Sequence, residues 1–527
     1  MGRIKVDRWT ILACTIVVES IGGLSYIFSL YSDSLKTKFQ LTQTKLDLLG
    51  TLSNIGATVG LHIGLLTDRV GPRPVVALGG AMGFFGWGAT FLALSPAVGW
   101  KCPYSILCLQ NLLQGQQALT TDVAVVASTG RMFPEHRGLA LGLAKSYVGL
   151  SGSLVTQAYQ GVFRPHVASF MLFIVAAIPL AAGLYVCVYV ELGPPRRETA
   201  ESHARTSKSF AAALLLTGCL ALALVASAMA SQLWAPADTA AVRLALTVAV
   251  AVLFSGVLFF LATRSDGSAK ARPDDAEEPL GAPLLLEDEA PPAPAVREYA
   301  FLESVRTFDF AILCLAFLCS SGPGLILINN LGQIVPAVGG LRRGAQDTFV
   351  SILSVCNCLG RLTAGVAGDV VIDRWRLPRP LCFGVFCLLT VGAMLLLAVG
   401  TPHALYGATV LGGFAYGGLN GGIPPIYTEL WGFRAFGAIY AAGSLAEGAA
   451  SYLLATKLFG SFYDAEARRQ NLPAGGACLG AGCFRAAALA AAALAAFAAL
   501  LSFWLAHRSR ARYDALYPRK TAGATVQ

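Results

Sequence analysis

Residues 64–74 read Gly64-Leu-Leu-Thr-Asp68-Arg69-Val-Gly71-Pro-Arg73-Pro74, and the second half of the chain repeats their skeleton. There, Gly365-Val-Ala-Gly-Asp369 is followed by an Arg-rich turn that ends at Pro380. A Gly lets two helices approach closely, and an Asp beside Arg residues forms charge-assisted pairs that hold neighbouring helix ends together. Two copies at matching positions weigh against the alternative, a basic loop that only sets topology. We therefore predict a latch that breaks and re-forms during a conformational change. Its candidate residues are Gly64, Asp68, Arg69, Gly71, Arg73, Gly365, Asp369 and Arg374.

Both copies follow the second apolar stretch of a six-stretch block. The chain has 527 residues, of which 55% are hydrophobic and only 13% are charged, whereas soluble domains have about a quarter charged residues. Fourteen apolar stretches are long enough to cross about 30 Å of hydrocarbon as helices. We therefore predict an all-α polytopic membrane protein with spans in a six, two, six arrangement. The spans lie near residues 9–31, 48–67, 75–95, 104–128, 138–162 and 167–190; 210–231 and 241–262; 308–336, 347–369, 381–400, 404–428, 436–460 and 484–506.

This arrangement predicts five parts of the chain. The long polar segment before the third block is acidic and rich in Pro, a composition that cannot bury a core. We expect it to be a disordered cytoplasmic tether; a folded regulatory element is the alternative. The parts are an N-terminal six-helix bundle (1–191), a linker with two additional helices (192–263), the disordered acidic Pro-rich loop (264–306), a C-terminal six-helix bundle (307–507) and a basic cytoplasmic tail (508–527).

The distribution of Lys and Arg predicts the orientation. Most of these residues fall in the termini and in the loops on the same side as the termini, which the positive-inside rule places in the cytoplasm. The start MGRIKVDRWT is basic but lacks a small-residue cleavage site, so we expect the first helix to be retained. Because topology accounts for the net charge of +9, we expect no nucleic-acid partner.

Several further motifs accompany the repeated loop. They are Asp7-Arg8-Trp9, Phe133-Pro-Glu-His-Arg137-Gly138, Gly142-Leu-Ala-Lys145-Ser-Tyr-Val-Gly149, Asn329-Asn330-Leu-Gly332-Gln333, Glu429-Leu-Trp-Gly-Phe-Arg434 and Cys478-Leu-Gly-Ala-Gly-Cys483. With these motifs the chain resembles the major facilitator superfamily, and within it the nodulin-like family of plants and algae. The resemblance implies two six-helix bundles around a central site that is reached by alternating access. It also implies a relation to oxalate, formate and monocarboxylate carriers, without a settled substrate.

Three residues depart from the patterns that the resemblance implies. Many drug and sugar carriers have an Arg in the fourth helix where this chain has Asn111, so proton coupling through that Arg is unsupported. Ser53 and Asn54 stand where nodulin-like relatives are expected to have a charged pair.

Five ionisable residues lie deep within apolar stretches, where a charge costs about 3 kcal/mol. They are Glu19, Asp122, Lys145, Arg361 and Glu447. In the arrangement that the resemblance implies, all five lie on helices that face the central cavity. Lys145 and Arg361 supply one cation from each bundle, so we predict that they anchor an anionic substrate. Asn357 lies four residues before Arg361 and therefore on the same helix face.

The buried acids are the predicted proton carriers. Glu19, Glu447 and Asp122 are the candidates, because protonation removes the cost of a buried carboxylate charge. Static pairs of Glu19 with Lys145 and of Glu447 with Arg361 are the alternative.

Neutral polar residues complete the predicted substrate site. Asn329, Asn330, Gln333, Tyr416 and Asn420 lie on predicted cavity helices and could orient a ligand. Hydrogen bonding between helices is the equally supported alternative for the amides.

The sequence therefore predicts a secondary transporter of a small, monocarboxylate-like organic anion, with proton coupling as the favoured mode. A carrier of neutral or cationic solutes and a non-transporting membrane sensor remain alternatives. We expect no enzyme activity, no cofactor, no metal site, a monomer in the lipid bilayer, and a plasma or vacuolar membrane location. Whether Cys478 and Cys483, which share a polar loop, form a disulfide or remain free thiols is open.

Overall fold

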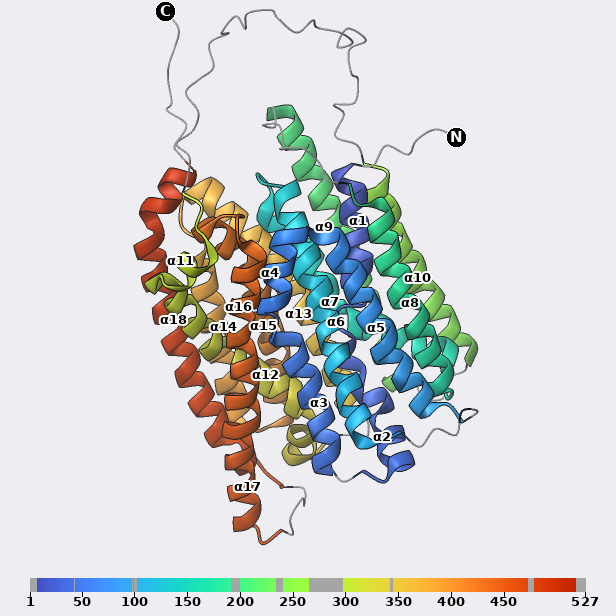
Figure 1. The fold of residues 1–527 in the computed structure, drawn as a ribbon. Helices are drawn as coiled ribbons and strands as arrows, with labels where there is room; N and C mark the ends of the chain where they lie inside the picture. The colour runs from blue at the N-terminus through green and yellow to red at the C-terminus, as the bar shows by residue number, and fades with distance from the viewer. Residues whose placement is uncertain are drawn as a thin grey trace, which may run out of the picture.

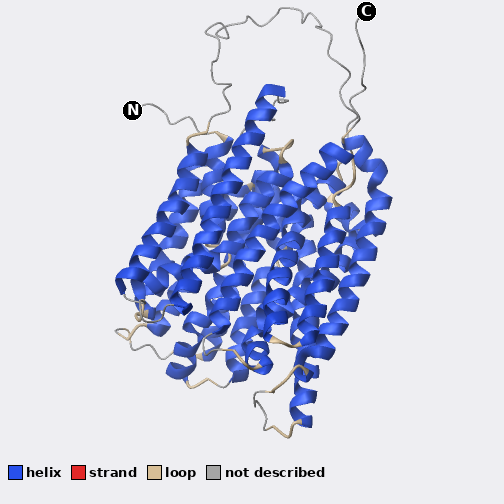
Figure 2. Ribbon diagram, turned by 180° about the vertical axis from the view of Figure 1, so that it is seen from behind, coloured by secondary structure: helices blue, strands red, loops and turns tan. Residues whose placement is uncertain are grey.

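The computed structural model describes residues 7–41, 43–96, 98, 102–190, 200–233, 240–264, 297–341, 345–472 and 478–517. Within these ranges the regular structure is helical and no strand occurs (Figure 2). The prediction of an all-α membrane protein is confirmed. Most of the predicted loop at 264–306 and half of the tail at 508–527 lie outside the described residues, so the expected disorder of the loop stays a prediction.

Helices occupy all fourteen predicted stretches. The first block contains α1 (Arg8–Glu19), η1 (Leu24–Ile27), α2 (Phe28–Phe39), α3 (Gln43–Thr58), α4 (Leu61–Val70), α5 (Pro72–Leu94), α6 (Tyr104–Met132), α7 (Arg137–Ala158), η2 (Tyr159–Phe163) and α8 (Val167–Val188). The inserted pair is α9 (Ala200–Leu233) and α10 (Ala240–Ala262). The last block contains α11 (Phe301–Val305), α12 (Phe308–Val338), α13 (Ala345–Trp375), α14 (Pro380–Val399), α15 (Pro402–Trp431), α16 (Phe436–Ala450), η4 (Ser451–Leu458), α17 (Phe459–Arg469) and α18 (Gly482–Leu516).

Judged by length and composition alone, ten helices in the described part of the chain are long and apolar enough to cross a membrane. Two further long helices, α6 and α15, carry more polar or glycine residues, which lowers their apolar character without shortening them. The helices η2 and η4 are π-helical and continue the fifth helix of each block. Such π-helical segments are rare and occur often at functional sites.

The prediction of a continuous first helix over 9–31 is wrong. The helix α1 ends at Glu19, and a turn that contains Gly22 and Gly23 precedes η1. Glycine carries no side chain to favour helical geometry, and two in succession weaken a helix interior by about 1 kcal/mol each. Glu19 therefore lies at a helix end in the middle of the bundle.

The second predicted helix, over 48–67, is also interrupted. The chain leaves helical geometry at Val59 and Gly60, and α4 begins at Leu61. A Cβ on Gly60 would lie 2.1 Å from the Leu119 side chain of α6, so the break allows two helices to approach closely. The Gln116 side chain donates to the backbone oxygens of Gly56 (2.8 Å) and Val59 (2.9 Å), which the break leaves without helical partners.

Figure 1 shows that α1 begins and α18 ends at the same end of the bundle, here called the terminal end. An even number of membrane crossings places the first and the last helix end on the same side of the membrane. The two blocks meet where α7 packs on α13 and where α16 packs on α4. The inserted helix α9 contacts α7 of the first block and α13 of the second, whereas α10 packs on α9, α1 and η2.

Candidate functional site

Asp68 joins the two bundles at the terminal end. Its carboxylate, near the end of α4, accepts hydrogen bonds from the backbone N–H groups of Gly437 and Ala438, both at 2.8 Å. These amides belong to the first turn of α16, where unpaired N–H groups and the helix dipole favour a negative charge. One turn earlier, a Cβ on Gly64 would lie 2.3 Å from the Gly437 carbonyl oxygen, so the two backbones touch.

Asp369 makes the equivalent contact from the second bundle. Its carboxylate accepts from the N–H groups of Gly138 (3.2 Å) and Leu139 (2.8 Å), in the first turn of α7. A Cβ on Gly365 would lie 2.4 Å from the Gly138 carbonyl oxygen. The two copies of the repeated motif therefore do the same thing, because each aspartate caps the fifth helix of the opposite bundle.

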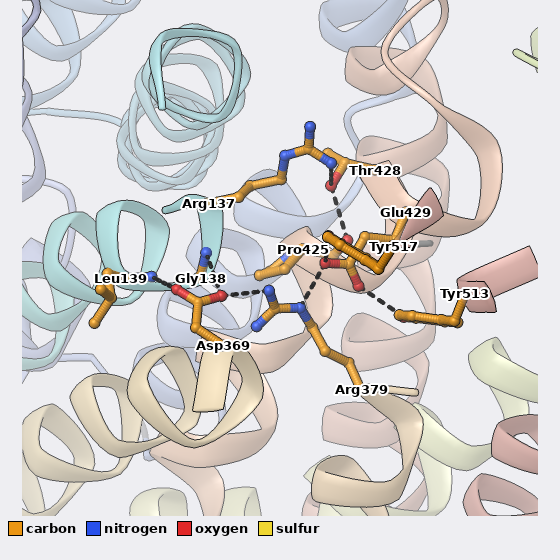
Figure 3. A network of polar contacts seen from close by, with 10 residues as sticks. All are labelled: Arg137, Gly138, Leu139, Asp369, Arg379, Pro425, Thr428, Glu429, Tyr513 and Tyr517. Carbon is orange, nitrogen blue, oxygen red and sulfur yellow. Dashed lines mark hydrogen bonds and ion pairs between the residues drawn. The ribbon is translucent and has the colours of Figure 1, made fainter. Parts of the chain in front are cut away.

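A buried charge network supports Asp369 and extends beyond the predicted pairing of this Asp with the Arg-rich turn (Figure 3). Arg379 donates to Asp369 at 2.5 Å and to Glu429 at 2.7 Å. Glu429, which is fully buried, also accepts from the hydroxyls of Tyr513 (2.7 Å) and Tyr517 (3.0 Å) at the end of α18. The network thus connects the latch to the end of the C-terminal helix.

The arrangement keeps Arg379 charged. Burial alone lowers the pKa of its guanidinium, but the adjacent Glu429 and Asp369 carboxylates outweigh burial and hold that pKa well above its ordinary value. Burial also raises the pKa of the Tyr517 hydroxyl, with a further contribution from the Glu429 charge. Tyr517 is therefore a neutral donor to Glu429.

The remaining predicted latch residues lie at the surface of the terminal end. The side chains of Arg69, Arg73 and Arg374 are exposed. Gly71 has φ +79°, a left-handed conformation that favours glycine, and it forms the turn between α4 and α5. Arg131 and Arg137 of the first bundle instead reach the second bundle: Arg131 donates to the Phe433 carbonyl at 3.3 Å, and Arg137 lies over the Phe433 ring.

In the middle of the bundle, Lys145, Asp122 and Tyr440 form a closed triad. The Lys145 ammonium contacts the Asp122 carboxylate at 2.5 Å and donates to the Tyr440 hydroxyl at 3.0 Å. That hydroxyl donates in turn to the other Asp122 oxygen at 2.8 Å. Tyr440 lies on α16, so the triad crosses between the bundles.

Glu19 and Arg361 lie within the same charged cluster. Glu19 is buried and interacts electrostatically with Asp122, Lys145 and Arg361. The Arg361 Nε donates to the Asn357 side-chain oxygen at 2.9 Å, as their shared helix face predicts. The structure thus brings together two cations and two acids, with one cation from each bundle. It pairs Lys145 with Asp122 directly, rather than with Glu19 as the alternative expected.

Glu447 makes its hydrogen bond to a different residue. It accepts a hydrogen bond from the Tyr416 hydroxyl at 2.5 Å, and the Asn420 amide donates to the Tyr416 backbone oxygen at 3.2 Å. The alternative pair of Glu447 with Arg361 is therefore not the contact that the structure contains.

The three polar residues of α12 differ in their surroundings. Asn330 is buried and donates to the backbone oxygens of Ile326 (3.0 Å) and Ala455 (3.1 Å), so it links α12 to the π-helical segment η4. Asn329 is exposed and donates to the Ser451 hydroxyl at 3.5 Å, whereas Gln333 is exposed. For Asn330 the structure contains the interhelical bonding that was the alternative to ligand binding.

The two remaining predictions concern the cysteine pair and metal sites. Cys478, which precedes α18, is joined in a disulfide to Cys483 in the first turn of that helix. In the part of the chain that the structure describes, no group of three or more His, Cys, Asp and Glu residues could hold a metal ion.

Comparison with protein families divides the chain at the long polar segment. The family profile described as Nodulin-like matches residues 8–260, and the profile described as NFD4, C-terminal domain matches residues 296–515. The first part of the chain matches the nodulin-like family, and the chain has the major facilitator fold. It is a transporter of the major facilitator type, as its motifs predict.

Individual relatives agree with this assignment. Protein NUCLEAR FUSION DEFECTIVE 4 of Arabidopsis thaliana is 27% identical over 82% of this chain and 76% of its own length. Probable transporter MCH1 of Wickerhamomyces anomalus is 26% identical and the oxalate:formate antiporter of Oxalobacter formigenes 28% identical, but each match spans only 33% of the relative.

Solved structures show the same fold at low sequence identity. A proton:xylose symporter superposes with a TM-score of 0.57 at 13% identity, over 95% of this chain and 96% of its own. The E. coli fucose:proton symporter superposes with a TM-score of 0.51 at 14% identity, over 95% of this chain and 99% of its own.

Sequence reasoning missed Tyr440, Arg379 and the two tyrosines at the end of α18. Tyr440 lies in an apolar stretch and reads as a core residue. Arg379 stands in the Arg-rich turn of the second repeat, and Glu429 opens one of the quoted motifs. The sequence therefore marked both residues, but it did not indicate that they pair with each other.

Proposed function

We propose that the nodulin-like chain is a secondary transporter of a small, monocarboxylate-like organic anion, with Arg361 and Lys145 as the anion-binding cations. The observation that carries the proposal is the buried cluster of Glu19, Asp122, Lys145 and Arg361, which draws charges from both bundles. Arg361 is hydrogen-bonded to a neutral amide, and its planar guanidinium can bind a carboxylate with two hydrogen bonds. Substrate at this position contacts both bundles and senses their relative movement.

Glu19 is the proposed proton carrier. One of its carboxylate oxygens is buried without a hydrogen-bond partner among the described residues, and Asp122 lies close enough to repel its charge. A buried carboxylate next to another carboxylate is costly, and a proton removes that cost. With Glu19 protonated, the cluster carries one net positive charge, which favours entry of a monovalent anion together with the proton. Asp122 would keep Lys145 in place, and Glu447 with Tyr416 would serve as a second proton site.

The two capping aspartates are the proposed latch. Alternating access requires the terminal end to open, and Asp68 and Asp369 make the contacts that would break. We propose that this end faces the cytoplasm, because the distribution of Lys and Arg favours that orientation.

Uptake by reconstituted vesicles tests the substrate proposal. Purified protein is incorporated into liposomes with an inward proton gradient, and uptake of radiolabelled formate, acetate and lactate is measured. Lys145→Gln and Arg361→Gln are each expected to reduce uptake by at least tenfold. Arg485→Gln, the same change at a helix-18 residue that bonds the Ala398 backbone, serves as the matched control and is expected to retain uptake. Undiminished uptake by both cluster variants would refute the assignment.

One observation favours a second candidate function. Because Lys145 is already neutralised by Asp122, the cluster offers less net positive charge than its two cations suggest. A carrier of neutral or cationic solutes fits this arrangement. Competition of uptake by neutral solutes but not by carboxylates would select it.

A further inference from the structure

An apolar crevice lies on the side of the first bundle, outside the charged cluster. It has a volume of about 260 Å³ and lies between the α1–η1 break, α7, α8 and the inserted helix α10. Its walls are formed mainly by aliphatic and aromatic side chains, including Leu24, Leu154, Ile178 and Phe254. The inserted pair therefore creates a space that the first bundle alone would not enclose.

The three polar residues in the wall are already bonded within the protein. Ser20 donates to the Ile16 carbonyl at 2.7 Å. The Gln157 amide donates to Thr247 at 3.1 Å and accepts from Ser227 of α9 at 2.8 Å. These bonds hold α9 and α10 against α7. Because the polar groups of the wall are bonded to the protein, the crevice offers a ligand mainly apolar contacts.

The crevice opens toward the bilayer. Its rim residue Phe173 is 42% exposed, and neighbouring side chains of α8 and α10 that point outward, such as Leu180 (72%) and Val252 (64%), are exposed apolar groups on membrane-spanning helices. Their surroundings are lipid hydrocarbon. An apolar cavity of about 150 Å³ in a protein stays dry and accepts a molecule of the size of benzene, so this larger crevice suits a longer hydrocarbon segment.

We propose that this crevice binds an acyl chain of a membrane phospholipid. The chain enters between α8 and α10 and lies against Ser20 and Ile21, the first residues after Glu19. It fills the space at the point where α1 is interrupted and supports the helix end that carries Glu19. The binding site does not depend on which solute is transported.

Photolabelling in lipid bilayers tests this site. The full-length protein is reconstituted with a phosphatidylcholine that carries a diazirine in its acyl chain, and labelled peptides are identified by mass spectrometry after irradiation. Labels are expected on the wall segments of α8 and α10. Ala177→Phe, which places a ring in the crevice, is expected to reduce that labelling at least fivefold.

Ala176→Phe is the matched control, since the adjacent residue makes the same change on the exposed outer face of α8 and is expected to retain the labelling. Ala251→Phe fills the crevice from α10 and covers the case in which Ala177→Phe does not fold. Labels spread over the outer faces of α8 and α10 and unaffected by both filling variants would overturn the proposal. Loss of labelling on addition of lactate, but not of excess phosphatidylcholine, would also overturn it, because the crevice would then belong to the substrate path.

Discussion

Replacing Asp68 by alanine removes one of the two aspartate caps that connect the bundles at the terminal end. The side chain makes two charge-assisted hydrogen bonds to the first turn of α16. A capping side chain is worth about 0.5–2 kcal/mol, and a carboxylate at a helix N-terminus adds about 0.3–1 kcal/mol through the helix dipole. Together these terms place the loss at about 1–3 kcal/mol.

The loss acts on the balance between two conformations, because both hydrogen bonds cross between the bundles. A change of about 1–3 kcal/mol shifts such an equilibrium about 5–150-fold. We expect Asp68→Ala to increase the population that is open at the terminal end. Spin labels on Val70→Cys and Arg434→Cys, both exposed at that end, report the separation by electron–electron double resonance, in a background whose other reactive cysteines are replaced.

Asp309→Ala is the matched control. Asp309 lies at the same end of the molecule, but it pairs with Arg508 within the second bundle. It is expected to leave the distance distribution unchanged. If Asp68→Ala gives the same distribution as the control, the cap does not hold the bundles together, and the latch proposal fails.

Two further predictions concern stability. Glu429→Gln removes the fully buried charged partner of Arg379, and we expect it to lower the free energy of unfolding by about 3–5 kcal/mol. The measurement is the thermal midpoint in detergent. The control is the same change at the half-exposed Glu303, which is expected to cost about 0.5 kcal/mol or less. Gly60→Ala places a Cβ 2.1 Å from Leu119, so we expect it to lower the free energy of unfolding by about 1–3 kcal/mol. Adding Leu119→Ala is expected to recover part of this loss. Equal stability of Gly60→Ala and the natural protein would contradict the packing argument.

The sequence was sufficient to predict the spans because hydrocarbon imposes a simple rule on length and polarity. It did not predict the two interruptions. Gly60 leaves helical geometry where it meets Leu119, and Gln116 compensates the freed carbonyls. These are contacts between helices, and local patterns carry little information about them.

The sequence also predicted part of the candidate site, namely which residues lie near one another but not which of them pair. Depth along a helix follows from residue number, and Glu19, Lys145 and Arg361, which were expected at similar depths, lie in one charged cluster. Which of them meet depends on the rotation of each helix about its axis. The pairing of Lys145 with Asp122 and the participation of Tyr440 follow from that rotation and could not be derived from spacing.

The inserted helix α9 lies between the two bundles and is hydrogen-bonded to α7 of the first. Thr217 and Ser227 are hydrogen-bonded to Tyr147 and Gln157 of α7, whereas on its other side α9 packs against α13. We expect these bonds to keep α9 with the first bundle when the bundles rock, so that α13 moves along it. The packing of α9 on α13 would then affect how fast the two faces of the transporter alternate.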